Sequence, residues 1–175
     1  PGGAGYIGSH AVKALAARGE TVIVYDNCSQ GHRAATRHAA AVVEGDIQDT
    51  AKLTQALSSH GVGAVMHFAA WLSVGDSVKD PAGYYRNHVG GALSVLEAMV
   101  ATGARHLVFS STCAVFGTPD TTPIHEDLPK RPINAYGETK LAIEYALPHF
   151  ETAYGLRSIA LRYFNAAGAD PEGEL

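Results

Sequence analysis

Short runs of apolar and β-branched residues alternate along this chain with longer stretches whose apolar residues recur at helical spacing. The short runs are typical of buried strands, and the longer stretches are typical of amphipathic helices. Strands that alternate with helices form a parallel sheet with right-handed crossovers, so we predict an α/β fold with a doubly wound parallel sheet. The predicted strands span residues 21–25, 41–44, 64–68, 106–110 and 158–162, and the predicted helices span residues 9–18, 34–38, 50–58, 81–101 and 135–154.

Glycine and proline mark where several of these elements begin and end. We expect Gly19 to stop the first helix, Pro81 to open the helix after the third strand, and Pro148 to kink or break the last helix. Residues 115–131 form the one long irregular stretch, and a loop of that length is usually functional or mobile. No domain boundary or internal repeat divides the chain.

The two ends of the chain indicate a piece of a longer protein. There is no initiator Met, Pro1 opens a loop that should follow a strand, and residues 169–175 stop in another loop. We therefore expect a fragment that lacks the first strand of its sheet. We also expect its folding to be impaired, because the strands beside the gap would have unpaired backbone groups.

The composition excludes several classes of protein. Of 175 residues, 46% are hydrophobic and 17% are charged, as in an ordinary globular α/β protein. A net charge of −4 without a basic cluster predicts no nucleic-acid partner and no membrane partner, and no apolar run approaches a membrane span. Nine scattered His residues without ligand spacing predict no metal site. Cys28 and Cys113 form no C-x-x-C pair, which favours a cytoplasmic protein.

A glycine-rich loop near the start of the chain is the first candidate site. Gly2, Gly5 and Gly8 precede the first predicted helix as G-x-x-G-x-x-G, which lets the backbone and the helix N-terminus approach a pyrophosphate. Asp26 ends the next strand, 26 − 8 = 18 residues after Gly8, where a carboxylate holds an adenosine ribose. Because a carboxylate repels a 2′-phosphate, NAD is favoured over NADP. The alternatives are an ordinary glycine turn and an ordinary turn aspartate.

Residues that follow two further strands are candidates for the same site, since ligands of a doubly wound sheet bind at the carboxyl ends of its strands. Asp46 and Ile47 follow one strand, and Phe68, Ala69 and Ala70 follow the next. The small residues after Phe68 would let the backbone contact a cofactor. Tight packing between helix and sheet is the alternative explanation.

Tyr136 and Lys140 are the candidate catalytic pair. Asn134 is the expected N-cap of their helix, and residues four apart on a helix share one face, so the phenol and the ammonium point into the same space. Lowering the tyrosine pKa from about 10 to about 7 needs roughly 4 kcal/mol, of which Lys140 would supply part and a cationic nicotinamide more. Taken alone, the pair is more typical of an ordinary helix with a buried Tyr and a surface Lys.

The hydroxyl-rich strand end from Ser110 to Thr112 points at the same edge of the predicted sheet. One of its hydroxyl groups can lie beside the Tyr136 oxygen, hydrogen-bond a substrate alcohol and relay its proton. By itself, however, a polar strand end more often caps nearby backbone.

Together these motifs resemble the UDP-hexose 4-epimerases of the extended short-chain dehydrogenase/reductase family, the NAD-dependent epimerases/dehydratases. The resemblance extends from Pro1 to about Asp170. The motifs that carry it, in chain order, are Gly2 to His10, Tyr25 to Asn27, Gly45 to Ile47, His67 to Ala70, Tyr136 to Lys140 and Leu161 to Asn165.

The resemblance implies a Rossmann-type NAD-binding domain over residues 1–175, incomplete at both ends, with most of a C-terminal substrate domain absent. It implies that UDP-glucose and UDP-galactose interconvert by transient oxidation at C4, after which the 4-keto sugar rotates and takes the hydride back. Tyr136 would be the base, Lys140 would bind the nicotinamide ribose and lower the pKa of that tyrosine, and Thr112 would hydrogen-bond the 4-oxygen. Asn165 would contact the sugar nucleotide. The implied NAD contacts are Gly2, Gly5, Tyr6, Ile7, Gly8, Asp26, Asn27, Asp46, Ile47, Phe68, Ala69, Ala70, Asn87, Ser110, Tyr136, Lys140, Tyr163 and Phe164.

The sequence departs from the family pattern at several positions, and it leaves open which reaction of the family the protein catalyses. Pro1 stands where the family usually has Thr, and Leu72 stands where many members carry a cofactor-contacting Lys. Sister dehydratases place an Asp-Glu pair after the Thr, whereas Cys113 and Ala114 stand here, which disfavours elimination of water. A related epimerase or decarboxylase for uronic UDP-sugars, acceptance of N-acetylated sugars, and a catalytically incompetent NAD-binding fragment all remain possible. Family members are often dimers through the helices near 82–100 and 135–154, so a homodimer is expected for the whole protein.

Overall fold

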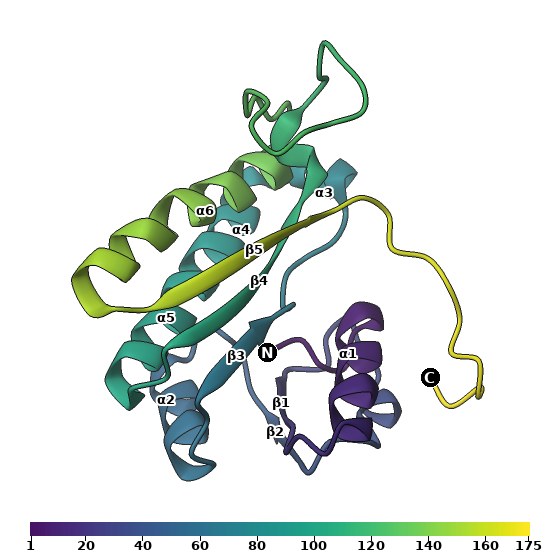
Figure 1. Ribbon diagram of the computed structural model, residues 1–175, viewed down its shortest axis with the longest axis vertical. Coiled ribbons are helices and arrows are strands. Elements are labelled where there is room, and N and C mark those ends of the chain that lie inside the picture. The colour runs from purple at the N-terminus through teal and green to yellow at the C-terminus, as the bar shows by residue number, and fades with distance from the viewer.

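The computed structural model describes residues 1–175 as a layer of parallel strands with helices on both faces (Figure 1). The elements are α1 (Tyr6–Ala17), β1 (Ile23–Asp26), η1 (Arg33–Thr36), β2 (Ala41–Glu44), α2 (Thr50–Ser59), β3 (Ala64–His67), α3 (Val74–Lys79), α4 (Pro81–Tyr85), η2 (Arg86–Gly90), α5 (Gly91–Thr102), β4 (His106–Thr112), η3 (Cys113–Phe116), α6 (Ala135–Tyr154) and β5 (Arg157–Tyr163). Figure 1 shows α1 on one side of the strands and α2, α4, α5 and α6 on the other. The predicted Rossmann-type α/β fold is therefore confirmed.

The sheet is divided into two pieces, which the first residues of the chain bridge. β1 pairs with β2, and β4 lies between β3 and β5, with every pair parallel. Gly2 N donates to Tyr25 O of β1 at 3.0 Å, and Pro1 O accepts from Phe68 N, just after β3, at 2.9 Å. The carboxyl ends of β1 and β3 are thus tied together by loop residues rather than by a continuous ladder.

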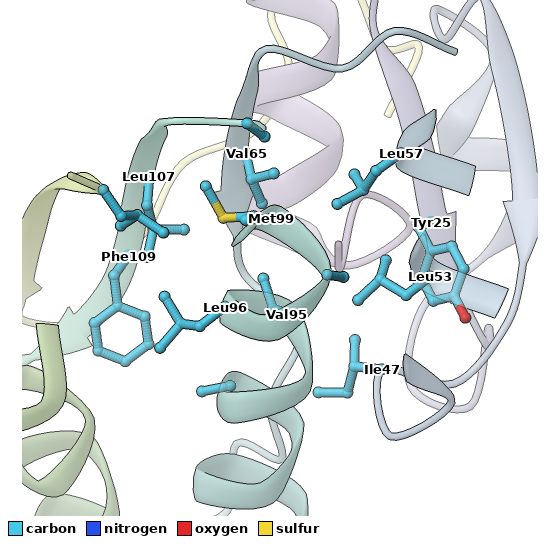
Figure 2. Packing of buried hydrophobic residues seen from close by; sticks show 14 of the residues in the cluster. Tyr25, Ile47, Leu53, Leu57, Val65, Val95, Leu96, Met99, Leu107 and Phe109 are labelled. Atoms are coloured by element: carbon cyan, nitrogen blue, oxygen red, sulfur yellow. The ribbon is translucent and has the colours of Figure 1, made fainter. Parts of the chain in front are cut away.

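A cluster of 17 buried apolar residues joins the two pieces of the sheet (Figure 2). In Figure 2, Leu96 and Met99 of α5 lie between Phe109 of β4 and Leu53 of α2, and Tyr25 of β1 belongs to the same cluster. Burying one side chain of this size contributes roughly 1.5–3 kcal/mol. The helical layer therefore holds β1 and β4 in one body even though the ladder between their strands is interrupted.

The sequence predicted α6 with one error. Asn134 is the N-cap, as expected, and its Oδ1 accepts from Gly137 N at 2.9 Å. Pro148 does not break the helix, because α6 runs without interruption to Tyr154, so that half of the prediction was wrong, and a kink stays a prediction. Proline removes one backbone donor, and the adjacent Leu147, 4% exposed in the core, keeps the helix packed across that position.

Other element boundaries differ from the predictions. α1 begins at Tyr6 rather than at residue 9. α3 was not predicted, although Ser73 caps it by accepting from Asp76 N at 3.1 Å. The predicted helix 81–101 contains a π-helical turn, η2, between α4 and α5. No helix of the structure combines the length and the apolarity needed to cross a bilayer.

Candidate active site

A cleft of about 450 Å³ is formed by the carboxyl ends of the strands, the start of α1 and the start of α6. Its volume lies in the range of roughly 300–1,000 Å³ that is usual for small-molecule and cofactor sites. The structure brings nearly all of the predicted site residues into its lining. These are Gly2, Gly5, Tyr6, Ile7, Gly8, Asp26, Asn27, Ile47, Phe68, Ala69, Ala70, Asn87, Ser110, Thr112, Tyr136, Lys140, Tyr163, Phe164 and Asn165.

The glycine-rich loop packs so closely that side chains are excluded from it. A Cβ atom on Gly8 would collide with the carbonyl oxygen of Gly2, and one on Gly2 would collide with the backbone of Ala69. Gly2 also has a φ of 87°, which residues with a side chain rarely adopt. The first turn of α1 therefore faces the cleft with bare backbone N–H groups and the positive end of the helix dipole, a site suited to a phosphate group.

Asp26 is fixed by backbone donors at the end of β1. Its Oδ2 accepts from Ala4 N at 2.9 Å and its Oδ1 accepts from Cys28 N at 2.8 Å. Each carboxylate oxygen has further acceptor capacity, and the residue lines the cleft beside the glycine-rich loop. The carboxylate can accept hydrogen bonds from the two hydroxyls of a ribose. The residues at this end of the cleft therefore fit a dinucleotide such as NAD.

Asp46 is the one predicted cofactor residue that does not line the cleft. Its Oδ2 accepts from Asn27 Nδ2 and its Oδ1 accepts from Gln48 N, both at 2.9 Å. The carboxylate is thus oriented toward its neighbours rather than into the cleft, and it holds Asn27, which does line the cleft. The prediction placed Asp46 by its position after a strand, which cannot show where a side chain finds its partners.

Sequence reasoning missed several lining residues, which are Ser29, Gln30, Gly31, Gly45, Trp71, Ser111 and Ala166. Leu72, whose departure from the family pattern was noted, also lines the cleft. A Cβ on Gly31 would collide with the backbone of Ala4, but only the folded chain shows this close approach. No pattern in the sequence shows that Trp71 and Leu72 lie against the cleft.

Lys140 lies buried at the other end of the cleft, beneath β4. Its Nζ donates to Ser110 O at 2.9 Å and lies 5.1 Å above the Phe109 ring. It lies 6.0 Å from the centre of the Tyr136 ring. Burial lowers the pKa of Lys140 to about 8, so the amine remains mostly protonated at pH 7.

Tyr136 shares this end of the cleft with Thr112. Burial raises the pKa of the Tyr136 phenol above its usual range, and the Thr112 hydroxyl opposes this shift by favouring the phenolate. In the protein alone the net pKa is therefore raised, so any lowering by Lys140 is smaller than the effect of burial. A base at this position needs a further positive charge, which a bound nicotinamide would carry.

A partly buried ion pair holds the elements around the candidate catalytic residues. Glu144, one turn after Lys140 on α6, accepts from Arg162 Nη2 at 2.7 Å and from Ser111 Oγ at 2.5 Å. Arg162 also donates through Nη1 to Glu126 O at 3.1 Å. These contacts tie α6 to β4, β5 and the irregular stretch before α6. They fix the place of Thr112, which follows Ser111 directly.

The last residues of the chain, 164–175, run from β5 to α1, and we call them the C-terminal strap (Figure 1). Tyr6 OH donates to Gly168 O at 2.7 Å, and Lys13 Nζ lies 2.8 Å from Asp170 Oδ1. The hydrogen bond from Lys13 lowers the pKa of Asp170, whose side chain is 4% exposed. The strap thus closes the side of the cleft between β5 and α1.

A Rossmann-type sheet with a glycine-lined helix N-terminus at the carboxyl ends of its strands is the arrangement of a dinucleotide-binding protein, and a Tyr–Lys pair lies in the same cleft. The sequence profile of the NAD dependent epimerase/dehydratase family matches residues 1–175. The chain belongs to this family.

Its relatives include UDP-glucose 4-epimerases. The enzyme of that name from Rhizobium meliloti is 50% identical over 174 residues, which cover 99% of this chain and 53% of the relative. The UDP-glucose 4-epimerase of Brucella ovis, crystallised with NAD, has a TM-score of 0.97 and 52% identity, covering 99% of this chain and 53% of that one. The Thermotoga maritima enzyme with UDP-glucose has a TM-score of 0.92 and 37% identity, covering 99% and 57%. This chain spans about half the length of the curated relatives it matches.

Proposed function

We propose that the whole protein interconverts UDP-glucose and UDP-galactose at C4, with NAD as its cofactor. The observation that carries this proposal is the convergence of Thr112, Tyr136 and Lys140 in the cleft that begins at the glycine-rich loop. Relatives with this activity in their names support it, at about half of their length.

The chain's own residues would bind and orient the cofactor. The first turn of α1 would hold the pyrophosphate, Asp26 would hold the adenosine ribose, and Lys140 would donate to the nicotinamide ribose. When bound, NAD supplies a hydride acceptor for C4 and a positively charged nicotinamide ring. Because Asp26 is anionic and held by two backbone donors, it disfavours a 2′-phosphate and so favours NAD over NADP.

Tyr136 would accept the proton of the sugar 4-hydroxyl and return it when the alcohol forms again on the other face. Thr112 would hydrogen-bond the same oxygen, and Asn165 would hold the sugar nucleotide. Lys140, mostly protonated at neutral pH, would stabilise the phenolate through space. The neighbours Cys113 and Ala114 offer no acid–base pair of the dehydratase kind.

A substrate assay with the whole protein tests this proposal. UDP-galactose and a catalytic amount of NAD should yield UDP-glucose with no net NADH, measured by a coupled dehydrogenase. NADH formed in proportion to substrate would indicate a dehydrogenase and contradict the proposal. UDP-N-acetylglucosamine and UDP-glucuronate, supplied in parallel, would show whether a related sugar is preferred.

The residues 1–175 on their own are proposed to bind NAD without turnover. The interrupted sheet and the coverage of about half of each relative favour this behaviour. Binding of NADH by the chain, followed by fluorescence, without conversion of UDP-galactose is the expected result. Turnover by the isolated chain would contradict it.

For the whole protein we further propose a homodimer that pairs through α5 and α6. Leu93 of α5 and Tyr145 of α6 are exposed apolar side chains that such an interface would cover. Sedimentation of the whole protein as a monomer would contradict the dimer. A cytoplasmic location and a place in galactose metabolism stay predictions.

A further inference from the structure

Four aromatic rings form a continuous row from the mouth of the cleft to Tyr136, and we call them the aromatic row. They are Trp71, Tyr84, His88 and Tyr136, each packed edge-to-face on the next. The centroids of neighbouring rings lie 5.3, 5.1 and 5.6 Å apart, at interplanar angles of 74°, 66° and 79°. Edge-to-face packing of this kind is directional and fixes each ring relative to its neighbour.

The π-helical turn η2 lets two neighbouring side chains, those of Asn87 and His88, contact the loop that follows β3. Asn87 Oδ1 accepts from Trp71 N at 3.1 Å, and His88 Nε2 lies 3.1 Å from Trp71 O. Adjacent residues of a regular α-helix point about 100° apart, whereas the wider turn lets both side chains reach the same residue. π-Turns inside helices are frequent at functional sites. Asn87 and His88 thus hydrogen-bond to the backbone N–H and the backbone carbonyl of Trp71, respectively.

The other ring nitrogen of His88 contacts α6, the helix that carries Tyr136. His88 Nδ1 lies 2.7 Å from Thr139 Oγ1, which also lies 2.8 Å from Tyr136 O. The His88 side chain therefore joins the loop after β3 to the first turn of α6. It is fully buried, at 1% exposure, so water cannot replace these partners.

The tautomer of His88 follows from its partners. The carbonyl of Trp71 can only accept, so Nε2 must carry the proton in the hydrogen bond between them. The single proton of the Thr139 hydroxyl can then be donated to His88 Nδ1 or to Tyr136 O, but not to both. The charged groups that face the ring favour the neutral form. Burial and the nearby Lys140 ammonium lower the pKa of His88 to about 3, and Tyr84 and Tyr136 are the other titratable groups packed against it.

We propose that His88, as the neutral Nε2–H tautomer, is a positioning residue that holds the Tyr136 ring and the Trp71 backbone in register across the cleft. This inference rests on the function proposed for Tyr136. His88 does not itself line the cleft and acts through Trp71 and Tyr136, which do. A buried histidine that only fills space would need neither the ordered pair of hydrogen bonds nor the π-turn.

Two substitutions separate positioning from packing, in the whole protein. His88→Phe keeps a ring in the aromatic row and removes both hydrogen bonds. His88→Gln loses the ring but keeps the order of groups, since its amide N–H can donate to Trp71 O and its Oε1 can accept from Thr139. We expect the Phe variant to lose about 10- to 100-fold in kcat at unchanged KM and NAD content, as expected for a misplaced catalytic group. The Gln variant should recover most of that loss.

Val95→Ala is the matched control. Val95 is a 1% exposed residue of α5 in the apolar core, and its truncation lowers stability without touching the aromatic row. It should lower the melting temperature and leave kcat unchanged. If His88→Phe folds and keeps its kcat, or if the Phe and Gln variants lose activity equally, positioning by hydrogen bonds is refuted.

A readout without activity keeps this test separate from that of the proposed function. Trp71 is the only tryptophan of residues 1–175, so the difference in emission between the whole protein and its Trp71→Phe variant, measured with and without each His88 substitution, reports on the loop. In His88→Phe the emission should shift to the red and become more accessible to acrylamide, and in His88→Gln it should not. A ¹⁵N spectrum should show the Nε2–H tautomer. A wild-type protein that does not epimerise would defeat the proposed function, and unchanged emission in His88→Phe or an Nδ1–H tautomer would defeat this inference.

Discussion

The two ends of the cleft differ in what lines them, which is backbone at one end and titratable side chains at the other. At the glycine-loop end, around Gly2, Gly8 and the start of α1, the surface is backbone packed so closely that a single added Cβ atom would collide. At the reaction end, around Lys140 and Tyr136, the surface consists of buried titratable side chains whose pKa values are shifted by burial. The first end is defined by space and the second by charge and hydrogen bonds. A substitution at the glycine-loop end should therefore weaken cofactor binding, and a substitution at the reaction end should lower turnover without weakening that binding.

The largest expected effect tests the reaction end alone. In the whole protein, Tyr136→Phe should lower turnover of UDP-galactose by about 10²- to 10⁴-fold, the usual contribution of a general base. NADH binding should stay unchanged, because the glycine-loop end is intact. Turnover and NADH fluorescence measured on the same preparation check both halves of this prediction. Turnover that survives the substitution would contradict the assignment of the base.

Gly8→Ala should give the opposite pattern. The added Cβ would collide with the Gly2 carbonyl, which is backbone and cannot rotate away. Overpacking of this kind costs about 1–3 kcal/mol, so NADH binding should weaken roughly 10- to 100-fold at 1.4 kcal/mol per factor of ten. Titration of NADH fluorescence measures this loss. Gly19→Ala is a less suitable control because of its positive φ, so Gly90→Ala, which meets no atom within 4 Å, serves instead and should bind normally.

Asp26→Asn sharpens the same end by charge rather than by space. The amide keeps the size of the side chain but removes the negative charge that would repel a 2′-phosphate. A hydrogen bond to a charged group contributes about 1.5–3 kcal/mol, so the preference for NADH over NADPH should fall by roughly 10-fold or more. Parallel titrations with the two cofactors measure the ratio. An unchanged ratio would show that Asp26 does not select the cofactor.

The last prediction concerns the pH dependence of stability and tests His88, beside the reaction end. The pKa of His88 is lowered from 6.5 to about 3, so between these values the unfolded chain binds more protons than the folded one. Its contribution to stability is complete above pH 6.5 and is lost, by up to about 1.4 kcal/mol per pH unit, as the pH falls toward 3. Urea unfolding of the whole protein at several pH values measures the slope. His88→Gln should reduce the slope but not abolish it, because burial also lowers the pKa of His67. An equally steep slope in that variant would contradict a contribution from His88.

The predictability of the two ends from sequence also differs. Gly2, Gly8 and Asp26 were predicted because short-range spacing encodes the strand, the turn and the helix start that place them. Tyr136 and Lys140 were found for the same reason, since four residues on one helix fix their common face. Such motifs are local, and the fold class follows from equally local patterns.

Features created by long-range packing were not predicted. The contact of His88 with Thr139 joins residues 51 positions apart, and nothing in the run that predicted a long helix indicates a π-turn. α3 and Trp71 lie in a segment without periodicity, where the cap at Ser73 was the only local signal. Asp46 shows the same limit from the other side, because its strand-end position was correct while its partners were set by Asn27 and Gln48.

The C-terminal strap has a consequence for how the site comes into being during synthesis. Lys13 and Asp170 form the ion pair that holds the strap against α1, and they are 157 positions apart in the sequence. Lys13 is therefore translated near the first cleft residues, and Asp170 only after the last of them. A nascent chain on the ribosome carries its glycine-rich loop uncovered until Asp170 has emerged. Enclosure of the cleft on the side of α1 therefore follows the synthesis of the other cleft residues, and a ribosome that stalls before this aspartate leaves that side open.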